Sequence, residues 1–340
     1  MARSSVTVDL GAIRHNARTL VRVLQGAELW AVVKADGYGH GAADVGRAAL
    51  EAGATALCVA GVAEGEALRA VLREARIVVL GPAGKGEVAR AREARLELAA
   101  VGGPVPEGVP VHLKLDTGMG RWGLSELPAP GRDVVALMSH FASADADEAF
   151  TRLQLERFLQ ATEPHPGPTR HVANSAAALG LPEARLDAAR CGIALYGVDP
   201  FGRDAAAHGL RPALGWRSEV AVTRLLRPGE STGYGRRYVA AEPTWIGLVP
   251  VGYADGFRRD LTGTEVLVAG ERRRVVGTIS MDALAVELPA DVAPGTEVSL
   301  LGDGITAEQH AAVAETIGYE ILCGVNARAP RATREVADGR

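Results

Sequence analysis

Lysine is rare in this chain, so the few lysines that it contains are informative. The 340 residues include 37 lysines and arginines together, and only Lys34, Lys85 and Lys114 are lysines. An arginine keeps its proton under ordinary conditions, whereas a lysine can release it and act as a nucleophile or a base. These positions are therefore candidates for amine chemistry, such as imine formation with an aldehyde.

Lys34 has the sequence context of a cofactor lysine. It follows the predicted buried strand Leu29–Val33 and precedes the glycine-containing run ADGYGHG. In a parallel barrel the carboxyl ends of the strands face the active site, and desolvation there would lower the pKa of an amine. Lys85, in contrast, lies in GPAGKGE, a run that is typical of a surface loop.

The composition is that of a globular protein with more than one domain. Hydrophobic residues make up 47% of the chain, enough for a large domain and a smaller one. The net charge of −4 comes without long runs of one sign, so neither a nucleic-acid nor a membrane-surface partner is indicated. No signal peptide or membrane-spanning run is predicted, and we expect a cytoplasmic protein. The cysteines are far apart and lack CxxC spacing, which indicates buried thiols and no metal site.

Alternating β-rich and helix-like segments predict an α/β fold for the first two-thirds of the chain. About eight β/α units in roughly 200 residues favour a closed (β/α)8 TIM barrel over an open sheet. The predicted strands are Leu29–Val33, Ala56–Ala60, Arg76–Leu80, Leu96–Val101, Val111–Leu115, Val134–Met138, Thr169–Ala173 and Leu186–Ile193. Amphipathic helices are predicted at Ala12–Leu24, Ala42–Glu51, Ala63–Arg73 and Glu148–Thr162.

The pattern changes near Leu214, where alternating strand patterns and turn signals begin. One helix, Ala307–Thr316, is predicted among these strands. We therefore expect a cofactor-binding barrel at 1–215 and a smaller, mostly β domain at 216–340. Residues 1–9 are candidates for pairing with the second domain.

Several motifs in fixed order carry a family resemblance. The segment AVVKADGYGHG, which contains Lys34, resembles the pyridoxal-phosphate attachment motif of the alanine racemases. The resemblance continues to the last domain and covers nearly the whole chain. Its other motifs are HLKLDTGMGRWG at 112–123, SHFASAD at 139–145, HVANSAA at 171–177, RCGIALYG at 190–197, STGYGRRY at 231–238, PVGYADG at 250–256 and GTISMD at 277–282.

The resemblance implies an isomerase that uses pyridoxal 5'-phosphate and two bases. The cofactor would form a Schiff base with Lys34, which would also serve as the base on the D-alanine side. Tyr234 would be the base on the L-alanine side, because racemisation needs a base on each face. These residues lie in different predicted domains, and in the family the tyrosine comes from the other subunit of a head-to-tail homodimer. The implied role is to supply D-alanine for bacterial peptidoglycan.

The resemblance also assigns the surroundings of the cofactor ring. Arg190 would meet the ring nitrogen, His171 would orient Arg190, and His140 would pack beside the ring. An arginine donates a hydrogen bond to the ring nitrogen without protonating it, which favours racemisation over transamination.

A second group would bind the phosphate. The Asn174–Ser175 pair begins an alanine-rich helical segment, and a helix N-terminus is a natural anion site. A plain helix cap explains the same pair equally well. The implied phosphate ligands are Tyr38, Asn174, Ser175, Gly192 and Ile193.

The substrate side of the site is implied in the same way. Arg121 would approach the cofactor's phenolic oxygen and the substrate carboxylate. Lys114 would be carbamylated and orient Arg121, or would form a simple ion pair with Asp116 or a neighbour. Carbamylation needs an amine, so an arginine could not replace Lys114.

The partner subunit would contribute the entrance. Tyr253, Met281 and Asp282 would line it, the Met281 backbone would bind the substrate carboxylate, and a narrow entrance would admit only small side chains. The sequence departs from the family near its end, where Ala327 stands in place of a phosphate-contacting tyrosine.

Three alternatives remain open on the sequence. A racemase of serine or another small amino acid would use the same residues, because one hydroxyl is poorly rejected by a small pocket. A related barrel decarboxylase would typically place an acidic group at the ring nitrogen, against which Arg190 argues. A non-catalytic cofactor carrier would lack the β domain and Tyr234.

Overall fold

The computed structural model describes residues 3–328 and 330–338, which form two compact units. The barrel unit comprises residues 13–201 and 205–211, and the β unit comprises the described residues of 1–12, 202–204 and 212–340. In the ranges that the structure describes, no helix is long and apolar enough to cross a membrane.

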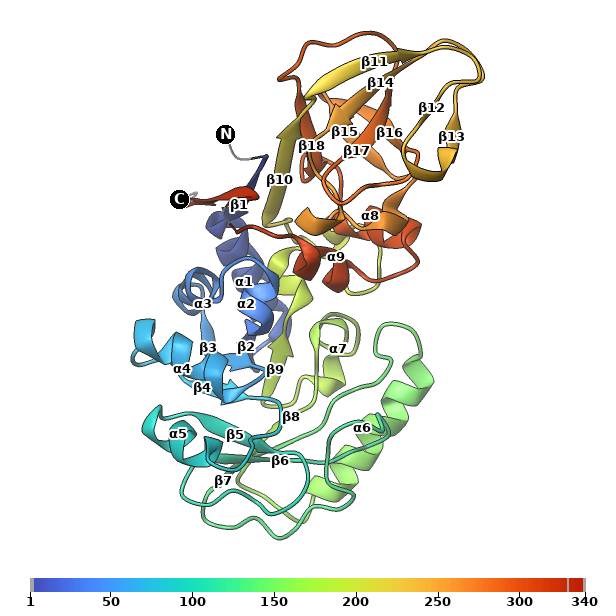
Figure 1. Cartoon of the computed structure of the whole chain (residues 1–340). Coiled ribbons are helices and arrows are strands. Elements are labelled where there is room, and N and C mark those ends of the chain that lie inside the picture. Colours follow the sequence, from blue (N-terminus) through green and yellow to red (C-terminus); the bar gives the residue numbers. More distant parts are fainter. Residues whose placement is uncertain (1–2, 329, 339–340) are drawn as a thin grey trace. The chain divides into compact units, whose positions relative to one another are not determined.

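Parallel strands close the barrel unit in the order β2 to β9 (Figure 1). Trp30 on β2 pairs with Ala56 on β3 and with Arg190 on β9, so the first and last strands are neighbours. The strands are mostly buried, as expected where helices cover a parallel sheet, and this confirms the predicted TIM barrel. Their bounds are β2 (Glu28–Val32), β3 (Ala54–Val59), β4 (Ile77–Val79), β5 (Glu97–Ala100), β6 (Val111–Lys114), β7 (Val134–Met138), β8 (Thr169–His171) and β9 (Ala188–Cys191).

The helices of the barrel lie between these strands in the chain. Helices α3 and α6 have the predicted bounds, and α6 begins where the Asp147 carboxylate accepts a hydrogen bond from the Phe150 N–H at 2.9 Å. The short α2 was not predicted and begins at Lys34. The helices are α1 (Leu10–Leu24), α2 (Lys34–Tyr38), α3 (Ala42–Glu51), α4 (Val62–Val71), α5 (Glu87–Glu93), α6 (Glu148–Thr162) and α7 (Ser175–Gly180).

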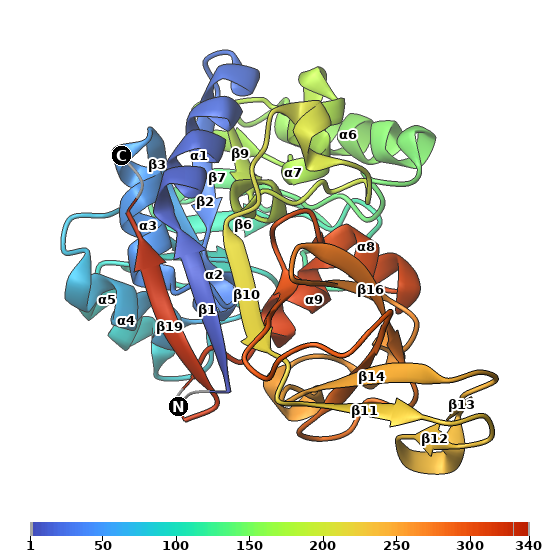
Figure 2. The same ribbon diagram turned by 90° about the horizontal axis from the view of Figure 1, so that it is seen from above.

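A long, mostly antiparallel sheet forms the β unit. Its strand order is β11-β14-β17-β16-β15-β18-β10-β1-β19, and β12 and β13 form a separate pair. The amino-terminal strand β1 (Ser4–Asp9) lies between β10 (Leu214–Glu219) and β19 (Ala332–Ala337), as Figure 2 shows. The remaining strands are β11 (Val222–Leu226), β12 (Ser231–Thr232), β13 (Tyr238–Val239), β14 (Thr244–Val249), β15 (Glu265–Val268), β16 (Glu271–Val276), β17 (Leu284–Leu288) and β18 (Glu297–Leu301).

The prediction of one helix in the β unit was wrong in extent and number. Helix α8 spans Ala307–Val313, and a second helix, α9, spans Gly318–Gly324. Between them Glu315 adopts a φ of 50°, a left-handed conformation that a continuing right-handed helix cannot contain. The segment from α8 to α9 therefore forms two short helices instead of one continuous helix.

Candidate active site

Lys34 is separated from the end of strand β2 only by Val33, and it starts an unusual turn. Ala35, Asp36, Gly37 and Tyr38 have φ values between 51° and 63°, in the left-handed region. Each non-glycine residue in that region costs roughly 1–2 kcal/mol, and such strain concentrates at functional sites. Lys34 itself is exposed in the single chain, so the desolvation expected from the sequence does not come from burial within this chain.

Two carboxylates hold this turn. Glu64 on α4 accepts hydrogen bonds from the backbone N–H groups of Ala35 at 2.8 Å and Ala60 at 2.7 Å. The Asp36 carboxylate accepts one from the N–H of Ala42, at the start of α3, at 2.9 Å. No sequence motif indicates Glu64, because its partners lie in separate loops that only the pairing of β2 with β3 brings together.

Tyr38 is buried beside the loop that follows β9. Its ring centroid lies 4.7 Å from that of Tyr196. Gly192 is so close that an added Cβ would lie 2.4 Å from the Tyr38 hydroxyl oxygen, so this approach requires a glycine. The Ser175 hydroxyl accepts a hydrogen bond from the Gly192 N–H at 3.0 Å. The predicted phosphate ligands Tyr38, Ser175 and Gly192 are thus brought together.

Asn174 acts as the cap of helix α7. Its side-chain oxygen accepts a hydrogen bond from the Ala177 N–H at 3.0 Å. Ser175 and Ile193 are both buried next to this cap, and Ile193 begins the 3-10 turn η2 (Ile193–Tyr196). Asn174 therefore caps helix α7 without any bound ligand, and this capping does not depend on phosphate binding.

The Arg190 guanidinium lies inside the barrel, and both of its Nη groups donate to protein acceptors. Nη1 donates to Nδ1 of His171 and, at 3.0 Å, to the His171 carbonyl oxygen. Nη2 donates to the carbonyl oxygens of Ser139 at 2.7 Å and Val172 at 3.2 Å, and to Nδ1 of His140 at 3.1 Å. Within the described part of the chain the Nε–H has no acceptor, so it is the donor left for a ligand.

Cationic side chains gather around this arginine. Burial, together with the positive charges of Arg190, Arg121 and Lys34, lowers the pKa of Lys114 to about 8. Burial and the same cations hold the pKa of His140 well below its usual range. The excess of positive charge fits an anionic ligand such as a phosphate ester.

The acidic residue nearest to Lys114 in the sequence does not neutralise it. Asp116 uses its carboxylate to accept hydrogen bonds from the N–H groups of Gly118 at 2.9 Å and Met119 at 2.8 Å. Among the described side chains, Lys114 forms no ion pair with Asp116. Lys114 Nζ instead lies 5.8 Å from the centroid of the Trp122 ring. A simple Lys114–Asp116 ion pair, one of the alternatives from the sequence, is not formed.

The other predicted site residues belong to the β unit. Tyr234 begins the 3-10 turn η4 (Tyr234–Arg236) and is 73% exposed, while its carbonyl oxygen accepts a hydrogen bond from the Thr278 hydroxyl at 2.7 Å. Tyr253 and Met281 are also exposed. The structure fixes the Tyr234 backbone but leaves its phenol open to solvent in the single chain.

Asp282, which follows Met281, is held by residues near both ends of the chain. Its carboxylate accepts hydrogen bonds from Arg3 at 2.9 Å and from Arg331 at 3.1 Å. Arg331 also pairs with the buried Asp255 at 2.8 Å. These contacts fix the segment after Met281. Ala327 lies in a nearby stretch of chain and is half-buried.

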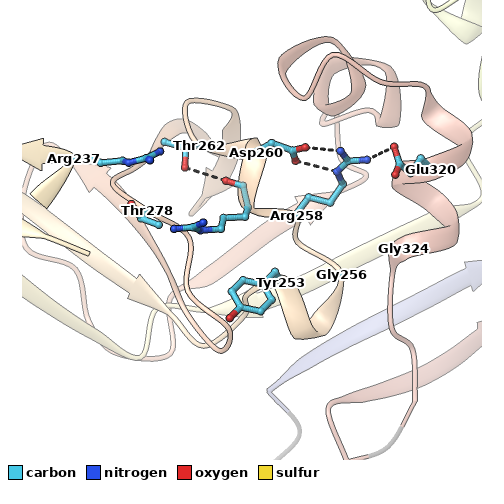
Figure 3. Close-up of a pocket in the computed structure, with 10 residues that line it drawn as sticks. Arg237, Tyr253, Gly256, Arg258, Asp260, Thr262, Thr278, Glu320 and Gly324 are labelled. Atoms are coloured by element: carbon cyan, nitrogen blue, oxygen red, sulfur yellow. Dashed lines mark hydrogen bonds and ion pairs between the residues drawn. The ribbon is translucent and has the colours of Figure 1, made fainter. Parts of the chain in front are cut away.

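A cavity of about 620 Å³ opens beside Tyr253 (Figure 3). Arg258 in its wall forms ion pairs with Asp260 and Glu320, which raise the pKa of the guanidinium. Arg237 also lines the cavity. Charged side chains therefore stand in the wall of this cavity, and Tyr253, which also lines it, is one of the predicted entrance residues.

The parallel barrel is closed, has a lysine after its first strand and a buried arginine on its last, and is followed in the chain by a β-rich unit. These features together define the class of pyridoxal-phosphate barrel enzymes. Models of the alanine racemase N-terminal and C-terminal domains match residues 8–200 and 213–333. The chain belongs to the alanine racemase family, a family of pyridoxal-phosphate-dependent isomerases, and the predicted resemblance is confirmed.

Individual relatives are similar along nearly their whole length. The chain is 41% identical to the alanine racemase of Symbiobacterium thermophilum over 95% of both chains, and 38% identical to alanine racemase 1 of Bacillus subtilis over 95% of this chain and 91% of that one. The crystal structure of the biosynthetic alanine racemase from Pseudomonas aeruginosa is 37% identical, with a TM-score of 0.92 over 99% of this chain and 100% of that one. The alanine racemase from Bacillus anthracis, with bound L-Ala-P, has a TM-score of 0.85 at 31% identity and covers 100% of this chain and 96% of that one.

Proposed function

We propose that this chain interconverts L-alanine and D-alanine, with Lys34 and Tyr234 as the two bases. The observation that carries the proposal is the position of Lys34. It lies just after the end of strand β2, on a strained turn, in a cluster of cations. An amine in that place can bind an anionic aldehyde cofactor, and near full-length similarity to alanine racemases supports the substrate.

The residues present suit pyridoxal phosphate. Lys34 would hold its aldehyde carbon, the Nε–H of Arg190 would face its ring nitrogen, and Tyr38, Ser175, Gly192 and the Asn174 helix cap would hold its phosphate. When bound, this cofactor withdraws electrons from the substrate's α-carbon and so acidifies the α-proton. Arg190 donates without giving up its proton, which favours return of the α-proton over transamination.

Each base would work on one face of the substrate. The Lys34 amine would move a proton on the D-alanine side, and the phenol of the partner subunit's Tyr234 would move one on the L-alanine side. The exposure of Tyr234 in the single chain supports this arrangement, because an obligate partner would cover it. We therefore infer a head-to-tail homodimer in which each site draws on both chains.

His140 would pack beside the cofactor ring. Its Nδ1 accepts a hydrogen bond from Arg190, so in the neutral ring Nε2 carries the proton.

Lys114 would act through Arg121. A pKa of about 8 leaves an appreciable neutral fraction of the Lys114 amine at neutral pH, and only a neutral amine takes up carbon dioxide. The resulting carbamate would give Arg121 the anionic partner that Asp116 does not supply to this cluster, and would aim Arg121 at the substrate carboxylate.

The entrance would select small substrates. Tyr253 and the segment of Met281 and Asp282 would line it from the partner subunit, and the Arg3 and Arg331 contacts would keep that segment in place. With Ala327 where relatives have a tyrosine, one phosphate contact would be absent or replaced by water. The reaction would proceed in the cytoplasm and supply D-alanine for peptidoglycan.

Incubation of the purified enzyme with L-alanine or L-serine in deuterated water tests this function. From L-alanine we expect deuterium at the α-carbon and both enantiomers of alanine. From L-serine we expect less deuterium and less of the opposite enantiomer. If neither L-alanine nor L-serine undergoes exchange, the racemase assignment is contradicted. Faster exchange from serine reassigns the substrate, and carbon dioxide release indicates the decarboxylase alternative, against which Arg190 argues.

A further inference from the structure

A continuous chain of hydrogen bonds crosses the barrel interior behind Arg190. The Glu97 carboxylate, at the start of β5, lies 2.7 Å from Nε2 of His112 on β6. Nδ1 of His112 lies 2.9 Å from Nε2 of His171 on β8, and Nδ1 of His171 accepts from Nη1 of Arg190 on β9. Arg76 fixes the far end, donating to both Glu97 oxygens at 2.8 Å and 2.9 Å.

The two ends of this chain determine the proton positions between them. A carboxylate can only accept and a guanidinium can only donate, whereas a neutral imidazole donates once and accepts once. His112 must therefore carry its proton on Nε2, facing Glu97, and its bare Nδ1 must accept from Nε2–H of His171. That leaves Nδ1 of His171 bare, as acceptor for Arg190. The chain is satisfied only when both imidazoles are neutral.

The surroundings favour the neutral forms. His112 and His171 are fully buried, and burial, with Arg190 nearby, lowers the pKa of both rings. The ring of Trp30 packs 4.4 Å from that of His171 and 5.6 Å from that of His112, measured between centroids. Hydrogen bonds from His112 and Arg76 keep Glu97 ionised and lower its pKa to about 2 despite its burial.

We propose that Glu97 is a positioning residue that acts on Arg190 through the tautomers of His112 and His171. This deepens the proposed function and rests on it, since Arg190 matters here as the donor to the cofactor's ring nitrogen. Without an acceptor at Glu97, His112 can carry its proton on Nδ1 instead. His171 must then turn its own proton toward Arg190, where two donors would face each other.

The consequence is a change in reaction outcome. An arginine that loses its inner acceptor shifts its guanidinium, and the ring nitrogen is then open to protonation by solvent. A protonated ring is the stronger electron sink, which would favour a half-transamination at the expense of racemisation: alanine would leave as pyruvate and its amino group would remain on the cofactor. A hydrogen bond to a charged group contributes at least about 1.5 kcal/mol, so its loss changes an equilibrium constant or a ratio of rates by about tenfold. We therefore expect about tenfold more pyruvate per alanine racemised in the Glu97→Leu holoenzyme.

Glu28→Leu is the matched control. Glu28 lies at the start of β2, 3.7 Å from Arg76, and accepts hydrogen bonds from Trp30 and Thr55 at 2.7 Å. It thus shares Arg76 with Glu97 but makes no hydrogen bond to either histidine among the described contacts. An equal product ratio in the two variants overturns the proposal.

Nitrogen-15 NMR of histidine-labelled wild-type holoenzyme tests the tautomers without relying on any variant to fold. We expect His112 and His171 to be neutral at pH 7, each with a protonated Nε2 and a bare Nδ1. An imidazolium or an Nδ1–H form at either residue overturns the proposal. Absence of racemisation with the expected tautomers would instead contradict the proposed function alone.

Discussion

The carboxylate of Glu64 accepts a 2.8 Å hydrogen bond from the backbone N–H of Ala35, the residue that follows Lys34. The same carboxylate accepts a second bond, at 2.7 Å, from the N–H of Ala60 in the loop after β3. One side chain therefore ties the strained turn after Lys34 to the loop that follows the neighbouring strand of the barrel.

Glu64→Gln should loosen this turn. A glutamine presents one oxygen and one NH2 group, so one of the two backbone N–H groups would face a donor, at a cost of about 1–3 kcal/mol. We expect roughly a tenfold or greater loss in kcat/KM for alanine racemisation, with cofactor binding weakened in the same variant. Glu66→Gln on the same helix is the control, because Glu66 pairs only with the exposed Arg90 in the described contacts. Equal activity of the two variants would argue against a role for Glu64.

Lys34→Arg should abolish cofactor attachment, because a guanidinium stays charged and cannot form the imine. Racemisation is expected to fall by at least about 10²–10⁴-fold, the usual contribution of a proton-transfer group. Lys85→Arg, in an exposed loop, should leave the imine absorbance and the rate unchanged. Retention of the absorbance in Lys34→Arg would show that another residue holds the cofactor.

Lys114 should carry a carbamate. With ¹³C-bicarbonate we expect a carbamate resonance in the wild-type spectrum that is absent from Lys114→Arg, because the pKa of about 8 makes the Lys114 amine partly neutral. Alanine should bind more weakly to the Lys114→Arg enzyme, which appears as a higher KM. A wild-type spectrum without the resonance would leave Arg121 without the proposed anionic partner.

The barrel unit should lose stability on acidification from pH 8 to pH 5. His112 and His171 have folded-state pKa values below the ordinary value of 6.5, so the unfolded chain binds more protons as pH falls through 6.5. Glu97 contributes to stability with the same sign. Its contribution is present above the ordinary carboxyl pKa of 4.5 and is lost as the pH falls toward its folded-state pKa of about 2. Urea unfolding followed by circular dichroism measures this. A free energy of unfolding that is constant or rises from pH 8 to pH 5 would mean that these histidines are not buried in the neutral form.

Much of the barrel site could be predicted from the sequence, because its residues lie in local motifs at strand ends. The scarcity of lysine made Lys34, Lys85 and Lys114 candidates, and the strand-end context and motif of Lys34 then singled it out. His171 and Arg190, which come from separate motifs, are hydrogen-bonded as the resemblance implied.

Other features could not be predicted, for a physical reason. Glu64 contacts Ala35 between the loops that follow β2 and β3, and Glu97 on β5 contacts His112 on β6, so neither role exists before these strands pair. The left-handed turn at Ala35–Gly37 runs against local preference and is imposed by such contacts. The division between α8 and α9 depends on one backbone angle at Glu315.

We propose that each active site takes Lys34 from one chain and Tyr234 from the other, and mixed dimers would show this sharing. Lys34→Ala and Tyr234→Phe chains, co-expressed with different tags, should each be inactive from L-alanine as homodimers. A heterodimer would contain one intact site and one doubly defective site. We predict that an equal, randomly paired mixture regains about a quarter of wild-type activity, since half of its dimers carry one of two sites. Activity no higher than that of the separate variants would contradict the shared site.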